Sequence, residues 1–254
     1  MPQVSAVIIT YNEERDIERC LKSIEGVADE IIVVDSFSTD KTKEICNKFN
    51  VKFYQHPFNG YRDQKNYALA LASYEHILSL DADEALSEKL KQSIINVKDN
   101  WDSDGYSFNR LNNYCGAWIH HTSWYPDRKI RLFDSKKGKW GGLNLHETVE
   151  MTNGSKVSNL NGDLLHWAYY SYEEHIQKVN NYSTLGAQEY FNAGKKSGPF
   201  SAILHSRWAF FKSYFLKRGF LDGYYGFVIS NLTAYKIFLK YIKLRKLIDQ
   251  SKSS

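Results

Sequence analysis

Strand-like and helix-like segments alternate over the first 80 residues, and this alternation limits the possible folds more than any other feature. Four β-branched runs are each too short for a buried helix, and they occupy residues 4–10, 30–35, 51–54 and 76–80. Helical spacing predicts helices between them, at 14–24, 39–49 and 61–73. Ser38 or Thr39 is the expected N-cap of the second helix. Strands joined in this way form right-handed βαβ units, so the segment predicts a parallel sheet.

The rest of the chain changes character twice. Short alternating runs between about residues 105 and 165 predict strands, and three long helices are expected at 172–193, 200–216 and 232–248. We therefore expect one domain over residues 1–195, made of two halves (1–100 and 101–195). A helical extension, basic and aromatic, would follow at 196–254.

Composition limits the compartment and the partners. Three cysteines without C-x-x-C spacing favour a reducing compartment over a disulfide framework. The start lacks the features of a signal peptide, and the longest uncharged stretch, 16 residues, is too short to span a bilayer. Residues 205–254 carry ten Lys or Arg against two Asp, whereas the whole chain has a net charge of +4. Such a tail suggests an anionic partner, either a membrane or a nucleic acid.

Carboxylates follow three of the predicted strands, at the edge where α/β sheets bind ligands. They lie in the segments 10–13, 35–40 and 81–84. Neither the glycine-rich dinucleotide fingerprint nor a P-loop follows the first strand. An acidic rim can instead hold phosphates through a divalent cation, and Asp81-x-Asp83 offers the oxygen ligands that Mg²⁺ or Mn²⁺ prefers.

Four segments in this order resemble family 2 glycosyltransferases, which have the GT-A fold. They are SAVIITYNEE, DEIIVVDSFSTDKT, a helix with Lys-Asn, and LSLDADE. The resemblance implies a Rossmann-like, mostly parallel α/β sheet flanked by helices, with a C-terminal helical extension. The domain over 1–195 would then be catalytic, with a nucleotide-sugar-binding half at 1–100 and an acceptor half at 101–195. WGGLNLHE, LLHWAY and KRGFLDGYYGF are similar to a subgroup that resembles lipopolysaccharide-core glycosyltransferases, which add glucose or a related hexose to inner-core sugars.

The resemblance also implies roles for individual residues. Asp35 would bind the nucleotide base and Tyr11 would stack on it, while Glu13 and Asp40 would lie near the ribose or base. The remaining nucleotide-sugar contacts would come from Thr10, Ala82, Asp81, Lys65 and Arg62, the last two near the diphosphate. The metal ligands would be Asp83, Asp81 and His166. The family usually has an acidic pair at the acceptor base position, and this chain has His146-Glu147, so Glu147 is the expected base.

These residue types suit an inverting transferase. One carboxylate deprotonates the acceptor hydroxyl, and a Lewis acid, Mg²⁺ or Mn²⁺, stabilises the leaving diphosphate. We expect a UDP-sugar donor, UDP-glucose first, and a lipid-linked saccharide acceptor such as a lipopolysaccharide inner core. The protein would act in the cytoplasm, peripherally bound to the inner face of the membrane. Lys236, Lys240 and Lys243 share a helical stripe that could face anionic lipid, with no role for nucleic acid. A similar aromatic cluster lies upstream, with Lys212, Lys217 and Arg218 interleaved, and consists of Trp208, Phe210, Phe211, Tyr214 and Phe215.

Plainer interpretations of the same residues stay open. Asp35 and Asp40 could cap the following helix, and Glu147 could form only a structural ion pair. His166 could be a core histidine and Tyr11 a packing residue. Arg62 and Lys65 could lie on a solvated helix face, and residues 81–84 could be an acidic helix start. His120-His121 could belong to an exposed loop, and the tail could serve internal packing.

Two other functions also fit part of the sequence. A sugar-nucleotide nucleotidyltransferase has a similar α/β site, but it would need a basic, glycine-rich loop where this chain has TYNEERD. A nucleic-acid-binding protein could use the basic tail, although the acidic rim would then have no role. The sequence does not identify the donor sugar, the acceptor linkage, the preferred metal or the oligomeric state.

Overall fold

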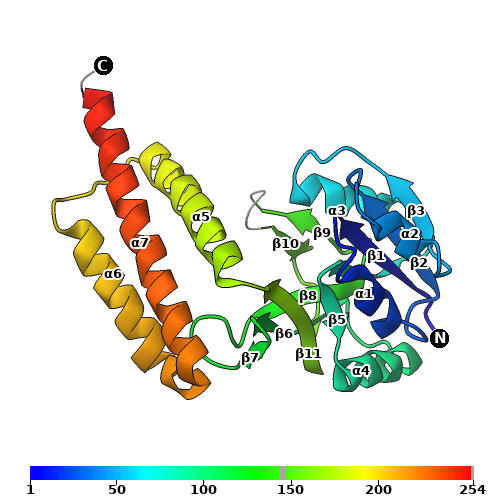
Figure 1. Ribbon diagram of the computed structural model, residues 1–254. Coiled ribbons are helices and arrows are strands. Elements are labelled where there is room, and N and C mark those ends of the chain that lie inside the picture. Colours follow the sequence, from blue (N-terminus) through cyan, green and yellow to red (C-terminus); the bar gives the residue numbers. More distant parts are fainter. Residues whose placement is uncertain (143–146, 253–254) are drawn as a thin grey trace. The chain divides into compact units, whose positions relative to one another are not determined.

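The computed structural model describes residues 1–142 and 147–252 of the chain (Figure 1). The chain divides into two compact units. The first unit comprises residues 1–111 and 127–166, and the second comprises 112–126 and 167–254. Compactness and function need not share a boundary, so the division into 1–195 and 196–254 stays a prediction.

A parallel sheet forms the centre of the first unit, as the alternation of elements predicts. Its strands are β1 (Val4–Thr10), β2 (Glu30–Asp35), β3 (Lys52–Gln55) and β4 (His76–Asp81). They lie in the order β3-β2-β1-β4, and all neighbours are parallel. β1 is buried along its whole length, which explains why its sequence is a continuous apolar run rather than an alternating one.

The middle of the chain extends this sheet beyond β4, mainly through antiparallel strands. β8 (Arg128–Asp134) pairs with β4, and β6 (Gly105–Tyr114), β11 (Val157–Tyr169) and β5 (Glu84–Leu86) follow in that order. β7 (Ala117–Ile119) pairs with β6, while β9 (Gly138–Gly141) and β10 (Thr148–Met151) form a separate hairpin. The alternating runs around 105–165 are therefore strands, as expected.

Three helices of the first unit are shorter than the sequence predicts, and a fourth, at residues 88–99, lies where no helix is predicted. They are α1 (Ile17–Ser23), α2 (Thr42–Cys46), α3 (Tyr61–Ala70) and α4 (Glu88–Asp99). The predicted N-cap of α2 is wrong, because the helix starts at Thr42 after Lys41. The Ser38 hydroxyl bonds to Asp35, and the Thr39 amide donates to Asn12, so both residues hold a loop instead of a helix start.

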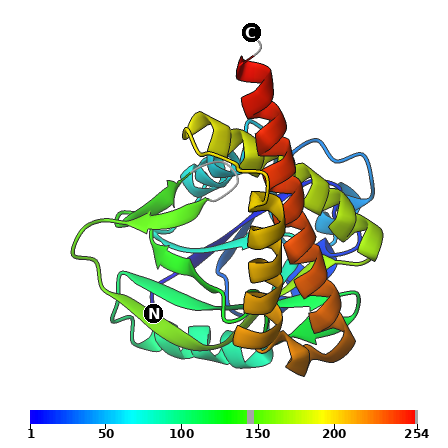
Figure 2. The same ribbon diagram turned by 90° about the vertical axis from the view of Figure 1, so that its left-hand side faces the viewer.

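Three helices dominate the second unit, namely α5 (Tyr172–Asn192), α6 (Ser201–Phe211) and α7 (Gly223–Lys252). A π-helical turn, η1 (Lys212–Leu216), and a 3-10 turn, η2 (Gly219–Asp222), connect α6 to α7. α7 packs along both α5 and α6, and α6 runs antiparallel to it (Figures 1 and 2). The last helix therefore begins at residue 223 rather than at 232. None of the described helices is both long and apolar enough to cross a bilayer.

The lysine stripe of α7 faces α5 instead of a membrane. The Lys240 ammonium lies 3.7 Å from the centroid of the Tyr190 ring, and Lys243 Nζ donates to the Asn180 carbonyl at 2.9 Å and to Ser183 Oγ at 2.7 Å. Burial, and then the charge of Lys240, lowers the pKa of Lys236. Lys240 and Lys243 therefore have partners inside the unit, which contradicts their expected contact with lipid, and Lys236 is half-buried.

The close approach of η2 to α7 yields a stability prediction. A Cβ at Gly226 would lie 1.8 Å from the Gly219 carbonyl oxygen. We expect Gly226→Ala to cost about 1–3 kcal/mol of unfolding free energy, because the backbone must shift, despite the better helix propensity of alanine. Thermal or urea unfolding followed by circular dichroism measures this.

Gly186→Ala is the matched control, since Gly186 is also a helix-interior glycine of the second unit. A Cβ there would meet only the flexible Lys240 side chain, at 3.1 Å. This variant should be neutral or more stable, by up to about 1 kcal/mol. Equal effects of the two substitutions would contradict the packing argument.

Candidate functional site

The carboxyl ends of β1, β2 and β4 lie side by side and gather three predicted site residues. Thr10 is paired in register with Asp35, and Ile9 is paired with Asp81. The Thr10 hydroxyl is buried and has no hydrogen-bond partner among the described residues. This edge is where parallel α/β sheets bind ligands.

Two loops at this edge are fastened to each other. The Asn12 amide donates to Ser38 Oγ at 2.8 Å, and the Thr39 amide donates to Asn12 Oδ1 at 2.8 Å. Asp35 is fully buried and accepts from the Ser38 amide at 3.0 Å and from Gln55 Nε2 at 3.1 Å. Asn12 has a φ of 54°, which asparagine tolerates better than most residues. The geometry supports a structural role for Asp35 in the second loop and leaves its contact with a base as a prediction.

Asp40, on the second loop, also accepts hydrogen bonds from nearby residues. Asp40 accepts from the Thr42 amide and hydroxyl at 3.0 and 2.6 Å, and from the Glu14 amide at 3.0 Å. Burial would raise the pKa of Asp40, but these hydrogen bonds lower it. The Glu13 amide donates to the Thr42 hydroxyl at 2.8 Å. Tyr11 is 57% exposed, so its ring is available for stacking and does not belong to the core.

Asp81, at the end of β4, lies between two buried cations. The Lys65 ammonium is 2.9 Å from its Oδ1, and Arg131 Nη2 donates to its Oδ2 at 3.0 Å. Lys65 and Arg131 are only 2% and 3% exposed. Burial would raise the pKa of Asp81, but the charges of Lys65 and Arg131 hold it well below its ordinary range. The carboxylate is therefore ionised, and Lys65 does not belong to a solvated helix face.

Both cations also bind further carboxylates, which extends the cluster. Lys65 Nζ donates to Glu147 Oε1 at 3.1 Å, and Arg131 Nη2 donates to Glu84 Oε1 at 2.9 Å. Arg110 lies 3.6 Å from Glu84 and 3.0 Å from Asp127. We call this alternating series the ion-pair chain, and in order its members are Glu147, Lys65, Asp81, Arg131, Glu84, Arg110 and Asp127.

Trp140 lies against the cations of the ion-pair chain. The centroid of its ring is 4.3 Å from Lys65 Nζ and 5.1 Å from Arg131 Cζ. Asn66, next to Lys65 on α3, donates to the Trp140 carbonyl at 2.9 Å and accepts from the Trp140 amide at 3.1 Å. Within the described part of the chain, Arg131 Nε and Nη1 and Trp140 Nε1 are buried without an acceptor. Such donors suit phosphate or sugar oxygens.

Asp83 and His166 form the pair that could hold a metal ion. His166 Nε2 lies 3.2 Å from Asp83 Oδ2, and both side chains are partly exposed. The backbone pairing of β11 with β5 places His166 opposite Glu84, which accounts for this proximity. A carboxylate oxygen and an imidazole nitrogen fit Mn²⁺, with substrate phosphates as further ligands. In residues 1–142 and 147–252, no cluster of three or more His, Cys, Asp or Glu side chains could hold a metal alone.

The other predicted residues lie apart from these contacts or outside the described residues. Arg62 is exposed and pairs with its neighbour Asp63 at 3.0 Å, while the Ala82 side chain is buried in the core. His146, the partner of Glu147 in the sequence motif, lies outside the described residues. His121, in the second unit, bonds to Asp222 at 2.9 Å and so has a structural contact.

The motifs in the sequence assign no role to Arg131, Arg110, Asn66 and Trp140, and they place Glu84 only in the acidic rim. One signal was available for Arg131, since it interrupts the run KIRLF on the same strand face as the buried Phe133. A charged residue on the buried face of a strand requires a partner. Its partners, Asp81 and Glu84, are about 50 residues away in the chain.

The ion-pair chain predicts a large difference between two arginines of β8. Arg131→Leu removes the cation shared by Asp81 and Glu84, so we expect a loss of about 3–5 kcal/mol of unfolding free energy, because the buried Glu84 and the half-buried Asp81 both lose a charge partner. Arg128→Leu changes an exposed residue of the same strand and should cost less than about 0.5 kcal/mol. Urea unfolding compares them, and equal stability of both variants would show that the buried pairs contribute little.

Comparison with known proteins identifies the family of this chain. The family model described as glycosyl transferase family 2 matches residues 5–150. An uncharacterised glycosyltransferase of Rickettsia typhi is 32% identical over all of this chain and 90% of its own length. A lipopolysaccharide core biosynthesis glycosyltransferase of Rhizobium meliloti, LpsC, is 30% identical over 98% of this chain and 97% of its own length.

Among solved structures, the chain is similar to S. aureus TarS 1–349 in complex with UDP-GlcNAc, with 16% identity and a TM-score of 0.48 over 99% of this chain and 92% of that one. The fold is α/β and GT-A-like, with a mixed sheet flanked by helices and long C-terminal helices, as the sequence motifs imply. The family model covers more than half of the sequence, and relatives above 30% identity span all of it. The chain therefore belongs to glycosyltransferase family 2.

Proposed function

We propose that this enzyme transfers a hexose from a UDP-sugar to a lipid-linked saccharide such as a lipopolysaccharide inner core. UDP-glucose is the donor that we test first. The similarity to LpsC along nearly the whole of both chains supports the acceptor class. We place the reaction at the cytoplasmic face of a membrane, where a lipid-linked acceptor would be held.

One observation carries this proposal. In the ion-pair chain, Lys65 lies between Glu147 and Asp81. Asp83, just past the end of β4, lies beside His166 of β11. The first unit thus provides a carboxylate that could serve as a base and a separate pair of metal-ligating side chains. An inverting transferase needs these two functions, whereas a glycosidase needs two carboxylates on either side of the bond.

The donor would bind along the carboxyl edge of the parallel strands. Tyr11 would stack on the base, because its ring is exposed at this edge. Asp35, Asp40 and Glu13 would approach the base or ribose. The buried donors of Arg131 and Trp140, together with the Thr10 hydroxyl, would bind diphosphate or sugar oxygens.

Glu147 would accept the proton of the acceptor hydroxyl. Its Oε1 is bound to Lys65, so we assign Oε2 to the acceptor. The ion pair with Lys65 fixes the direction of the Glu147 carboxylate. The structural ion pair considered from the sequence is therefore present, and in this mechanism it orients the base.

Asp83 and His166 would hold the divalent cation, Mg²⁺ or Mn²⁺. When bound, the cation would offset the negative charge of the leaving diphosphate. Asp81 already has two cationic partners, so we assign it to positioning Lys65 and Arg131, and its direct coordination stays a prediction.

The base assignment predicts a selective loss of rate. Glu147→Gln should lower kcat for hexose transfer about 10²–10⁴-fold, because a positioned base contributes that much. UDP-sugar affinity, measured by calorimetry, should stay within about threefold, because the amide can still accept a bond from Lys65. Glu150→Gln, on the exposed side of β10, is the control and should keep the wild-type rate. A wild-type rate for Glu147→Gln would move the base elsewhere, with Asp127 or Asp134 tested next.

The metal assignment predicts a binding defect that needs no turnover. Asp83→Asn and His166→Gln should each weaken UDP-dependent Mn²⁺ binding about tenfold or more, as seen by electron paramagnetic resonance, because each removes one ligand. Asp99→Asn, at the exposed end of α4, should bind Mn²⁺ as the wild type does. Full transfer activity in excess EDTA would contradict the proposed metal dependence. Unchanged Mn²⁺ binding in both site variants would place the ligands elsewhere.

A further inference from the structure

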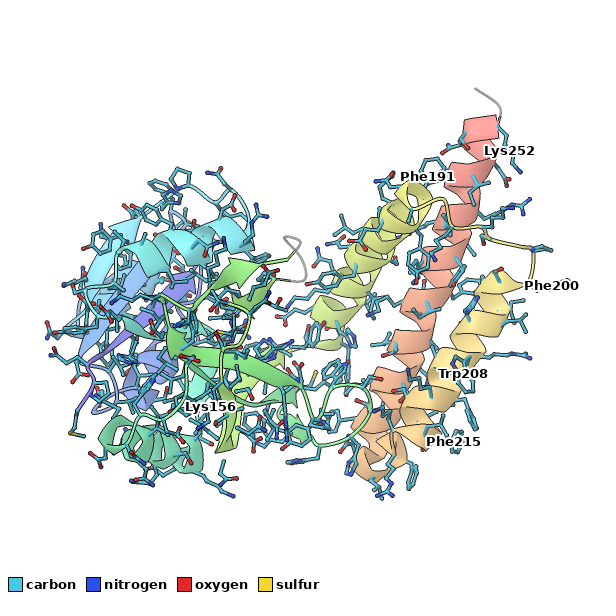
Figure 3. All side chains as sticks on the ribbon, turned by 180° about the vertical axis from the view of Figure 1, so that it is seen from behind. Lys156, Phe191, Phe200, Trp208, Phe215 and Lys252 are labelled. Carbon is cyan, nitrogen blue, oxygen red and sulfur yellow. The ribbon has the colours of Figure 1, made fainter. Side chains whose placement is uncertain are left out.

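The helix α6 and the turns after it expose a row of large apolar side chains. Phe200, Leu204 and Trp208 are 68%, 65% and 56% exposed, and four further members of the row are also exposed, namely Phe211, Phe215, Leu216 and Leu221. Phe200, Trp208 and Phe215 follow one another along the edge of the helical hairpin in Figure 3. We call this row the aromatic face. Exposed apolar surface of this extent marks an interaction site.

The opposite side of α6 consists of small residues. Ala202, Ser206, Ala209 and Ser213 are all more buried than the residues of the aromatic face. Ser213 Oγ forms a hydrogen bond of 2.9 Å with Ser230 Oγ on α7. A helix in water normally buries its large apolar side chains and exposes its small or polar ones. α6 does the reverse, with small residues at the helix contact, which is the arrangement of helices that face lipid.

Only positive charges accompany the aromatic face. Arg207, Lys212, Lys217 and Arg218 lie within or beside it, and all four are exposed. Between Glu189 and Asp249 the only acidic residue is Asp222. The Asp222 carboxylate is buried, where it accepts from the His121 amide at 2.8 Å and contacts the His121 ring at 2.9 Å. The surface is therefore cationic and apolar, without a negative group at its centre.

We propose that the aromatic face docks on an anionic lipid bilayer, with α6 lying in the headgroup region. Aromatic and leucine side chains would enter the acyl boundary while the four cations remain at the level of the lipid phosphates. The proposal rests on the proposed function in one respect, since a lipid-linked acceptor would share that bilayer. It narrows the sequence expectation, which named both helices, because α6 rather than the lysine stripe of α7 provides the surface.

Flotation with lipid vesicles tests the docking surface in the full-length protein. The wild type should bind vesicles of phosphatidylcholine with 30% phosphatidylglycerol, and high salt should weaken this binding. The double variant Trp208→Ser/Phe215→Ser should bind about tenfold or more weakly, because it loses the inserted side chains. The double variant Lys212→Gln/Lys217→Gln should lose the preference for anionic over neutral vesicles.

Phe58→Ser is the matched control for exposure. Phe58 lies in the first unit and is 50% exposed, as is Phe215. It should bind vesicles as the wild type does, and thermal unfolding should show that all variants remain folded. Failure of the wild type to bind anionic vesicles at low salt would overturn the proposal. Equal binding by Trp208→Ser/Phe215→Ser and the wild type would do the same.

Transfer to a water-soluble, delipidated saccharide separates this proposal from the proposed function. Trp208→Ser/Phe215→Ser should transfer hexose to that acceptor at the wild-type rate, because the aromatic face contains no residue of the candidate site. Vesicle binding without transfer to any saccharide would contradict the proposed function and leave the docking surface supported. Transfer of hexose without vesicle binding would contradict the docking surface and leave the proposed function supported.

Discussion

A half-buried, ionised carboxylate between two buried cations, at the end of β4, is the constraint on which the candidate site depends. Asp81 can stay charged there only because Lys65 and Arg131 approach it from α3 and β8. Each cation is itself buried and needs a second carboxylate, so the pairing extends to Glu147 on one side and Glu84 on the other. Charge balance thereby fixes α3, β4, β5, β8 and the segment before β10 relative to one another.

The sequence predicts the strands of the first unit better than the side-chain contacts between them. β1 and β2 have the predicted bounds, because continuous apolar runs are long enough to define them. The acidic edge also follows, since parallel strands end together. The ion-pair chain does not follow, because Arg131 reaches Asp81 only through the antiparallel pairing of β8 with β4. The spacing of residues within either strand does not predict that pairing.

The second unit shows a different limit of sequence patterns. Both α6 and α7 carry basic and aromatic residues at helical spacing, so either could face lipid. Only the packing of α7 against α5 shows that Lys243 already has partners. The structure shows that the small residues of α6 lie against α7. The large apolar side chains of α6 therefore face away from α7 and are exposed. Which of the two helices exposes its aromatic and basic side chains is therefore decided by tertiary packing and not by sequence spacing.

The two hydrogen bonds between Asn66 and Trp140 have a consequence for how acceptor preference could change. They tie β9 to α3, and the neighbouring Lys65 holds Glu147 at the start of β10. Trp140 of β9 and Glu147 before β10 are therefore both held by neighbouring residues of one helix. Under the proposed mechanism, sequence changes between these two residues would leave the proposed base bound to Lys65. A lineage of such enzymes would then be able to acquire new acceptors without rebuilding its chemistry.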